Sequence, residues 1–167
     1  MKRNDEARLV LLSVGQSPAA VLSALRREVG LSDFVLSEMV LRTAQTVRRW
    51  RTGSASDDIP DPAISAVDDL RAIVAMLLGA GYEGPSIKRF LQSRNTGLGQ
   101  DRPLDALRVG VGGFREVERV TECFIAGIAP DSGSSLVNED DDEVEPAVLD
   151  SPPPEPTLPP QPVGDRS

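Results

Sequence analysis

The chain of 167 residues contains no histidine, a single cysteine, a single tryptophan and only 4% aromatic side chains. Without histidine there is no imidazole general base, no histidine–metal site and no Ser-His-Asp triad. The lone Cys123 excludes an intramolecular disulfide and a zinc site built from several thiolates. These absences leave few groups for catalysis, so we expect a protein that is not an enzyme and that carries no cofactor or metal.

Long apolar runs are also missing. No segment approaches the roughly 20 consecutive apolar residues that a membrane-spanning helix requires. The start of the chain, Met1–Glu6, turns acidic at once and leads only to the short apolar run Leu9–Leu12. This is not the pattern of a secretory signal peptide. The sequence therefore predicts a soluble cytoplasmic protein that does not interact with membranes.

Charge is distributed unevenly along the chain. The net charge is −8, yet residues 1–56 carry +4, residues 57–129 carry −3 and residues 130–167 carry −9. The acidic character thus belongs to the C-terminal tail, whereas the N-terminal part is mildly basic. Such asymmetry suggests different partners for different parts of the chain.

The tail, residues 130–167, holds nine of the 14 prolines and the unbroken acidic run Glu139–Glu143. Its apolar residues are scattered, so burying them cannot offset the entropy lost on ordering. We predict disorder here, with residues 152–162 stiffened toward polyproline II. Two readings stay open, a solubilising tail or a charged arm that competes for a basic site on this protein or on a partner.

The rest of the chain predicts helices and no strand, because apolar residues recur at helical spacing and nowhere alternate with period two. Ser17-Pro18 and Asp61-Pro62 each pair an N-cap residue with a proline in the first turn, and Gly30 ends a helix. The predicted fold is all-α, with a helical domain over residues 1–53, a second over residues 59–127 and the tail over residues 130–167.

Residues 31–53 predict two short helices joined by a tight turn. Ser32 can cap the first helix and Thr43 the second, and only Leu41 and Arg42 separate them. Two helices with so short a joint must cross steeply, which is the geometry of a helix-turn-helix whose second helix enters a DNA major groove. The inner faces are expected to consist of Leu36, Met39, Val40, Val47 and Trp50, with Trp50 in the core.

The outer face of the second helix is polar and basic. Gln45 can pair with adenine and an arginine with guanine, each through two hydrogen bonds. Thr43, Arg48 and Arg51 are better placed for phosphates. The candidate DNA-binding residues are Thr43, Ala44, Gln45, Thr46, Arg48, Arg49 and Arg51. A net charge of +4 supports only modest affinity, so a dimer would be needed to recognise an operator.

This segment resembles the helix-turn-helix of the Xre family of bacterial regulators. The residues that match its pattern in register are Leu31, Ser32, Leu36, Thr43, Thr46, Val47, Trp50 and Gly53. The resemblance implies base contacts from Ala44, Gln45 and Arg49.

Three departures from the Xre pattern matter. Leu41 replaces the turn glycine, which costs energy if that position needs a positive φ. Arg42 replaces an apolar residue, and Asp33 stands near a usual phosphate-binding position, where its charge would repel DNA. The alternative is therefore a helical hairpin that kept the fold and lost DNA binding.

A second motif occupies residues 87–107. Asn95, Gly97 and Gly99 suit a loop with tight backbone turns. Leu98, between the two glycines, must pack into the core or against a partner. The stretch resembles the toxin-binding domain of Xre/MbcA/ParS-type antitoxins, with Arg94 in place of a proline and Gln100 in place of a second glycine. The candidate toxin-binding residues are Phe90, Leu91, Asn95, Leu98, Gly99, Pro103, Leu104 and Leu107.

The resemblance, which covers about residues 17–126, implies a non-enzymatic antitoxin of a type II toxin–antitoxin system. Members neutralise a cognate protein toxin, often a RES-domain enzyme that consumes NAD, usually act as homodimers and can bind operator DNA to repress their own operon. We expect Leu91, Leu98, Leu104 and Leu107 to form the apolar dock for the toxin. The alternatives are a helix-turn-helix transcriptional regulator without a toxin partner, or a protein-interaction module that no longer binds DNA.

Overall fold

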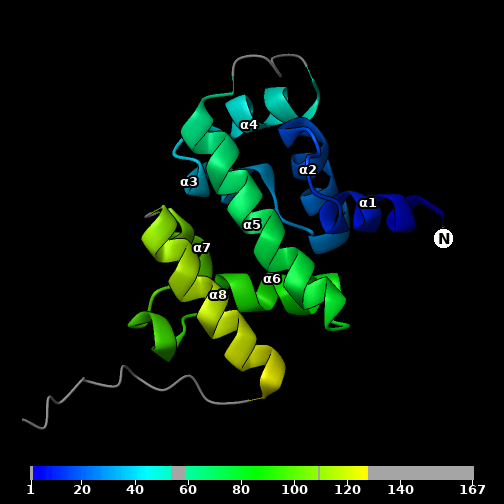
Figure 1. The fold of residues 1–167 in the computed structure, drawn as a ribbon. Helices are drawn as coiled ribbons and strands as arrows, with labels where there is room; N and C mark the ends of the chain where they lie inside the picture. Colours follow the sequence, from blue (N-terminus) through cyan, green and yellow to red (C-terminus); the bar gives the residue numbers. More distant parts are fainter. Residues whose placement is uncertain (1, 54–58, 109, 128–167) are drawn as a thin grey trace, which may run out of the picture. The chain divides into compact units, whose positions relative to one another are not determined.

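The computed structural model describes residues 2–53, 59–108 and 110–127, and all regular structure in these residues is helical (Figure 1). The all-α prediction is therefore confirmed for this part of the chain. The predicted tail at residues 130–167 and most of the predicted linker lie outside the described residues. The elements are α1 (Lys2–Leu12), α2 (Pro18–Ala24), the π-helical turn η1 (Leu25–Val29), α3 (Asp33–Met39), α4 (Ala44–Arg51), α5 (Asp61–Gly79), α6 (Gly84–Gln92), the 3₁₀ turn η3 (Thr96–Leu98), α7 (Pro103–Leu107) and α8 (Val111–Ala126).

Side-chain caps fix the starts of the N-terminal helices. The hydroxyl oxygens of Ser17, Ser32 and Thr43 each accept a hydrogen bond from the backbone N–H three residues later, at 3.2–3.3 Å. These three predicted N-caps are confirmed, and so is Gly30, which ends η1 with φ +77°. The N-cap prediction for Asp61 is wrong by one residue. The carbonyl of Pro60 accepts the first helical hydrogen bonds of α5, so Asp61 is already helical.

Helix α5 runs through the middle of the helical body, with α2 on one side and α7 and α8 on the other (Figure 1). Its apolar stripe is buried, in line with the helical spacing of apolar residues along the chain. The buried residues of this helix are Ala63, Val67, Leu70, Ile73, Val74, Leu77 and Leu78. They belong to one hydrophobic cluster that draws residues from every α-helix between α1 and α8. The predicted segments 1–53 and 59–127 thus share one core and lie in one compact unit.

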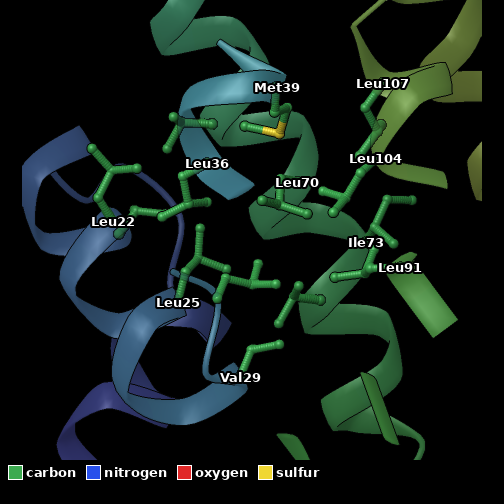
Figure 2. Packing of buried hydrophobic residues seen from close by; sticks show 14 of the residues in the cluster. Leu22, Leu25, Val29, Leu36, Met39, Leu70, Ile73, Leu91, Leu104 and Leu107 are labelled. Carbon is green, nitrogen blue, oxygen red and sulfur yellow. The ribbon is translucent and has the colours of Figure 1, made fainter. Parts of the chain in front are cut away.

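The backbones of the two segments approach each other closely at the start of α6. Gly84, the first residue of α6, lies so near Glu28 of η1 that a β-carbon at position 84 would collide with the Glu28 carbonyl. A glycine is needed here because of this approach. Figure 2 shows the adjoining core, in which Leu25 and Val29 of η1 join the cluster around Leu70 and Ile73 of α5. None of the helices in the described residues is long and apolar enough to cross a membrane.

Candidate nucleic-acid and protein interfaces

Helix α4 is anchored on its inner side. Val47 is fully buried and Trp50 is 3% exposed, so both pack into the core, as expected for Trp50. The hydroxyl of Ser23 on α2 donates a hydrogen bond to the carbonyl of Arg51 at 3.1 Å. Gly53 follows α4 with φ +79°, and its N–H donates to the carbonyl of Trp50. These contacts hold the orientation of α4 relative to α2 and α3.

Anchoring the inner side leaves the opposite face of α4 open to solvent. Gln45, Arg48 and Arg49 are exposed, and their spacing of three and four residues places them together on one face. Thr43 is exposed, whereas Ala44 and Thr46 are half-buried. Within the described residues neither Arg48 nor Arg49 takes part in an ion pair. The face thus offers two unpaired guanidinium groups and an amide.

Arg51, in contrast, forms an ion pair with Asp33. Its Nε and Nη2 donate to the two carboxylate oxygens of Asp33 at 3.0 and 3.2 Å, and Nη1 of Arg26 lies 3.0 Å from the same carboxylate. Burial alone would raise the pKa of Asp33, but the hydrogen bonds and charges of Arg51, and then of Arg26, outweigh it and lower that pKa. The carboxylate that was expected to repel DNA is therefore flanked by two cations, and the guanidinium of Arg51 is engaged inside the protein.

The turn between α3 and α4 contains a left-handed residue. Leu41 has φ +54°, and it is 62% exposed. The position that carries a glycine in the Xre pattern thus does adopt a positive φ, although a leucine occupies it. The N–H of Arg42 donates to the carbonyl of Ser37 at 3.0 Å, which closes the turn.

The loop between α6 and α7 is closed by its own hydrogen bonds. The side-chain oxygen of Asn95 accepts from the N–H of Gly97 at 2.9 Å, and the N–H of Asn95 donates to the carbonyl of Asp101 at 3.0 Å. Gly99 and Gln100 both have positive φ, at +63° and +76°. The predicted tight turns are confirmed, and hydrogen bonds within the loop connect its two ends.

Most of the predicted toxin-binding side chains are covered by the protein itself. Leu91, Leu98, Leu104 and Leu107 are between 0% and 8% exposed, and Phe90 and Pro103 are also buried. Figure 2 shows Leu91, Leu104 and Leu107 within the cluster that includes Leu70 and Ile73 of α5. Only Asn95, half-buried, and Gly99, exposed, reach the surface. In this conformation the four leucines pack inside the protein and offer little surface to a partner.

A surface cavity of about 390 Å³ lies where α6 meets α8. Its apolar part is an aromatic group in which the ring centroids of Tyr82 and Phe90 lie 5.0 and 4.8 Å from that of Phe124. The remaining lining residues are Ser86, Arg89, Ser93, Arg94 and Asn95. Phe90 and Asn95 were among the predicted binding residues, but the sequence did not bring Tyr82 and Phe124 to this site, because 42 residues separate them. The chain has only six aromatic side chains, and three of them line this cavity.

A second cavity, of about 370 Å³, borders the strained turn at Leu41 and the start of α5. Its lining is mainly apolar, with Arg42, Asp69 and Arg108 as its charged members. Burial, and then the charge of the neighbouring Asp68, raise the pKa of Asp69. Because this lining mixes both signs of charge, it indicates no particular ligand.

Comparison of the chain with models of protein families, with curated proteins and with solved structures finds no match.

Proposed function

We propose that this protein is an antitoxin-type regulator that binds a protein toxin and its own operator DNA. In this proposal α3 and α4 form a helix-turn-helix, and the part from α6 to α8 engages the toxin. The toxin class suggested by the resemblance is a RES-domain enzyme that consumes NAD. The observation that carries the proposal is the outer face of α4, where Gln45, Arg48 and Arg49 stand exposed and unpaired on a helix whose inner side is locked.

The size and chemistry of α4 suit a major groove. An α-helix with its side chains is about 10–12 Å across, which fits the roughly 12 Å width of the groove, and α4 has eight residues. Gln45 and Arg49 are one helical turn apart, so both can reach base edges while Arg48 contacts a phosphate. The pairing of Asp33 with two arginines supports this reading, because it reduces the repulsion that a free carboxylate beside the DNA would cause.

The toxin-binding part of the proposal rests on the motif in residues 87–107 and on the loop that follows α6. The loop is held by five backbone hydrogen bonds between residues 95 and 101 and by the buried side chain of Leu98. A preorganised loop loses little entropy on binding, which favours a protein interface. Packing of α3 against α7 places this part on the same rigid core as α4, so one molecule can carry both surfaces.

DNA binding is tested with the purified full-length protein and the DNA upstream of its own gene. Gln45→Ala and Arg49→Ala should each weaken binding by about 1–3 kcal/mol, while leaving the affinity for unrelated DNA nearly unchanged. Arg115→Ala, an exposed arginine on α8, serves as the control. Absence of binding by the native protein at low salt would show that α3 and α4 keep only a structural role.

Toxin binding is tested by co-expression with the product of the adjacent reading frame. That product should arrest growth when expressed alone, and this protein should restore growth and copurify with it. A harmless or unbound neighbour would favour the alternative, a helix-turn-helix regulator without a toxin partner. Sedimentation of the purified protein would show whether it is the homodimer that operator recognition requires.

A further inference from the structure

We propose that the aromatic cavity lined by Tyr82, Phe90 and Phe124 is the docking site for an acidic segment of the partner protein. An apolar side chain of that segment enters the cavity, and its flanking carboxylates pair with Arg89 and Arg94. The inference rests on the proposed function, since it names the surface and the chemistry by which the partner is held.

The apolar part of this site is partly open to solvent, unlike the hydrophobic core. Phe124 lies on the last turn of α8 and is 39% exposed, although Phe90 and Tyr82 both pack against its ring. The hydroxyl of Tyr82 lies 3.5 Å from the carbonyl of Phe124, which holds the tyrosine against the end of α8. A side chain entering the cavity would cover the exposed part of Phe124, and aromatic anchors of this kind dominate binding energy at protein interfaces.

The charge around the cavity fixes the chemistry of the partner. Arg89 on α6 and Arg94 just beyond it are exposed, and neither has an ion-pair partner within the described residues. Among the described residues no carboxylate lines the cavity, although residues 57–129 carry a net charge of −3. Two unpaired arginines beside an apolar hollow complement a segment with carboxylates around an apolar residue.

A protein segment fits this site better than a nucleic acid. Single-stranded nucleic acids bind by stacking bases on open ring faces. Here Phe90 is buried, and both Phe90 and Tyr82 direct ring surface toward Phe124. The cavity instead offers a hollow with two serine hydroxyls, from Ser86 and Ser93, and an amide from Asn95. These groups can hydrogen-bond the backbone of an extended segment.

The test compares two charge reversals in the full-length protein. Arg89→Glu with Arg94→Glu inverts the charge at the cavity, and Arg27→Glu with Arg115→Glu makes the same change at exposed arginines elsewhere. Affinity for the product of the adjacent reading frame is measured by titration calorimetry at several salt concentrations. The cavity variant should bind at least about tenfold more weakly and lose most of the salt dependence, whereas the control should bind like the native protein.

A second pair of variants tests the apolar contact. Phe124→Ala should weaken partner binding as much as the charge reversal does, and Phe124→Leu should restore most of the affinity. Thermal melting of each variant shows whether the fold is kept. If Phe124→Ala unfolds, the affinity of the Arg89→Glu and Arg94→Glu variant alone tests the docking site.

The outcomes separate this inference from the proposed function. If the native protein does not bind the product of the adjacent reading frame, both the proposed function and the docking site are overturned. If the native protein binds and the cavity variant binds equally well, only the docking site is overturned. Loss of DNA affinity in the cavity variant, with partner binding unchanged, would also overturn it and would assign the arginines to nucleic acid.

Discussion

Arg51 at the end of α4 donates two hydrogen bonds to Asp33 at the start of α3, through Nε at 3.0 Å and Nη2 at 3.2 Å. Arg26 of η1 adds an ion pair of 3.0 Å to the same carboxylate, whose side chain is only 14% exposed. One carboxylate thus joins three helical elements beneath the outer face of α4. The geometry of the candidate DNA-binding helix depends on this contact.

Asp33→Asn should therefore destabilise the protein by about 1–3 kcal/mol at neutral pH, because a partly buried charged pair would lose its anion. The pKa of Asp33 is lower in the folded state than in the unfolded chain. Its contribution to stability is then present above the unfolded value of about 3.9 and is lost as pH falls through the lower folded value.

Urea unfolding of the native protein and of Asp33→Asn over a range of pH checks this prediction. The difference in free energy of unfolding should be largest near pH 7 and should shrink toward pH 2. Glu116→Gln, at an exposed carboxylate without an ion pair among the described residues, is the matched control and should change little. A difference that stays constant with pH would mean that the charge of Asp33 contributes nothing.

The strained turn before α4 gives a second prediction. Leu41 has φ +54° and exposes 62% of its surface, so its side chain contributes little burial while its backbone is strained. Leu41→Gly should be about 0.5–1 kcal/mol more stable than Leu41→Ala, because glycine alone adopts a positive φ without a steric penalty. Chemical unfolding of the two variants measures the difference directly. A glycine variant less stable than the alanine variant would show that the turn carries no such strain.

Local patterns were sufficient to predict the helices and most of the caps that were proposed, with Asp61 as the exception. Ser17, Ser32 and Thr43 act over three residues of sequence, so the hydrogen bonds that they make can be anticipated from spacing alone. Leu41 was expected to be strained only if its position needs a positive φ, which it has, whereas the positive φ of Gln100 was not predicted. These features depend on the backbone near them and on little else.

Features that depend on tertiary packing could not be predicted in this way. The pairing of Arg51 with Asp33 and the packing of Tyr82 on Phe124 join residues far apart in sequence. Periodicity showed that Leu91 and Leu104 lie on apolar faces, but it cannot tell a face that packs internally from one that receives a partner. Leu91 and Leu104 are buried in the core that includes α5. We therefore expect a partner to contact the exposed residues nearby.

The close approach of α6 to η1 gives a third prediction. Gly84→Ala should destabilise the protein by about 1–3 kcal/mol, since the new β-carbon would overlap the Glu28 carbonyl. A backbone carbonyl cannot rotate away as the end of a flexible side chain can. Gly112→Ala is the matched control, because nothing lies within 4 Å of a β-carbon at that helical position. The control should gain about 0.5–1 kcal/mol. Equal stability of the two variants in urea would show that η1 and α6 separate easily.

Asp69 gives a prediction of opposite sign to that for Asp33. Burial and the neighbouring Asp68 raise its pKa in the folded state. Ionising Asp69 therefore disfavours folding, so its unfavourable contribution is absent well below the unfolded value of about 3.9. That contribution grows as pH rises toward the higher folded value, and it persists above that value. Replacing the carboxyl with a neutral amide should remove this effect.

Asp69→Asn should thus be at least as stable as the native protein at pH 7, and this advantage should disappear near pH 3. Asp68→Asn should gain less than Asp69→Asn, because it removes a charge that raises the pKa of Asp69 but also loses the ion pair of 3.8 Å with Nε of Arg71. Unfolding in urea at pH 3, 5 and 7 measures both variants. If Asp69→Asn were instead less stable than the native protein at pH 7, the carboxylate would have to make a favourable contact at the cavity beside Leu41, and the sign argued here would be reversed.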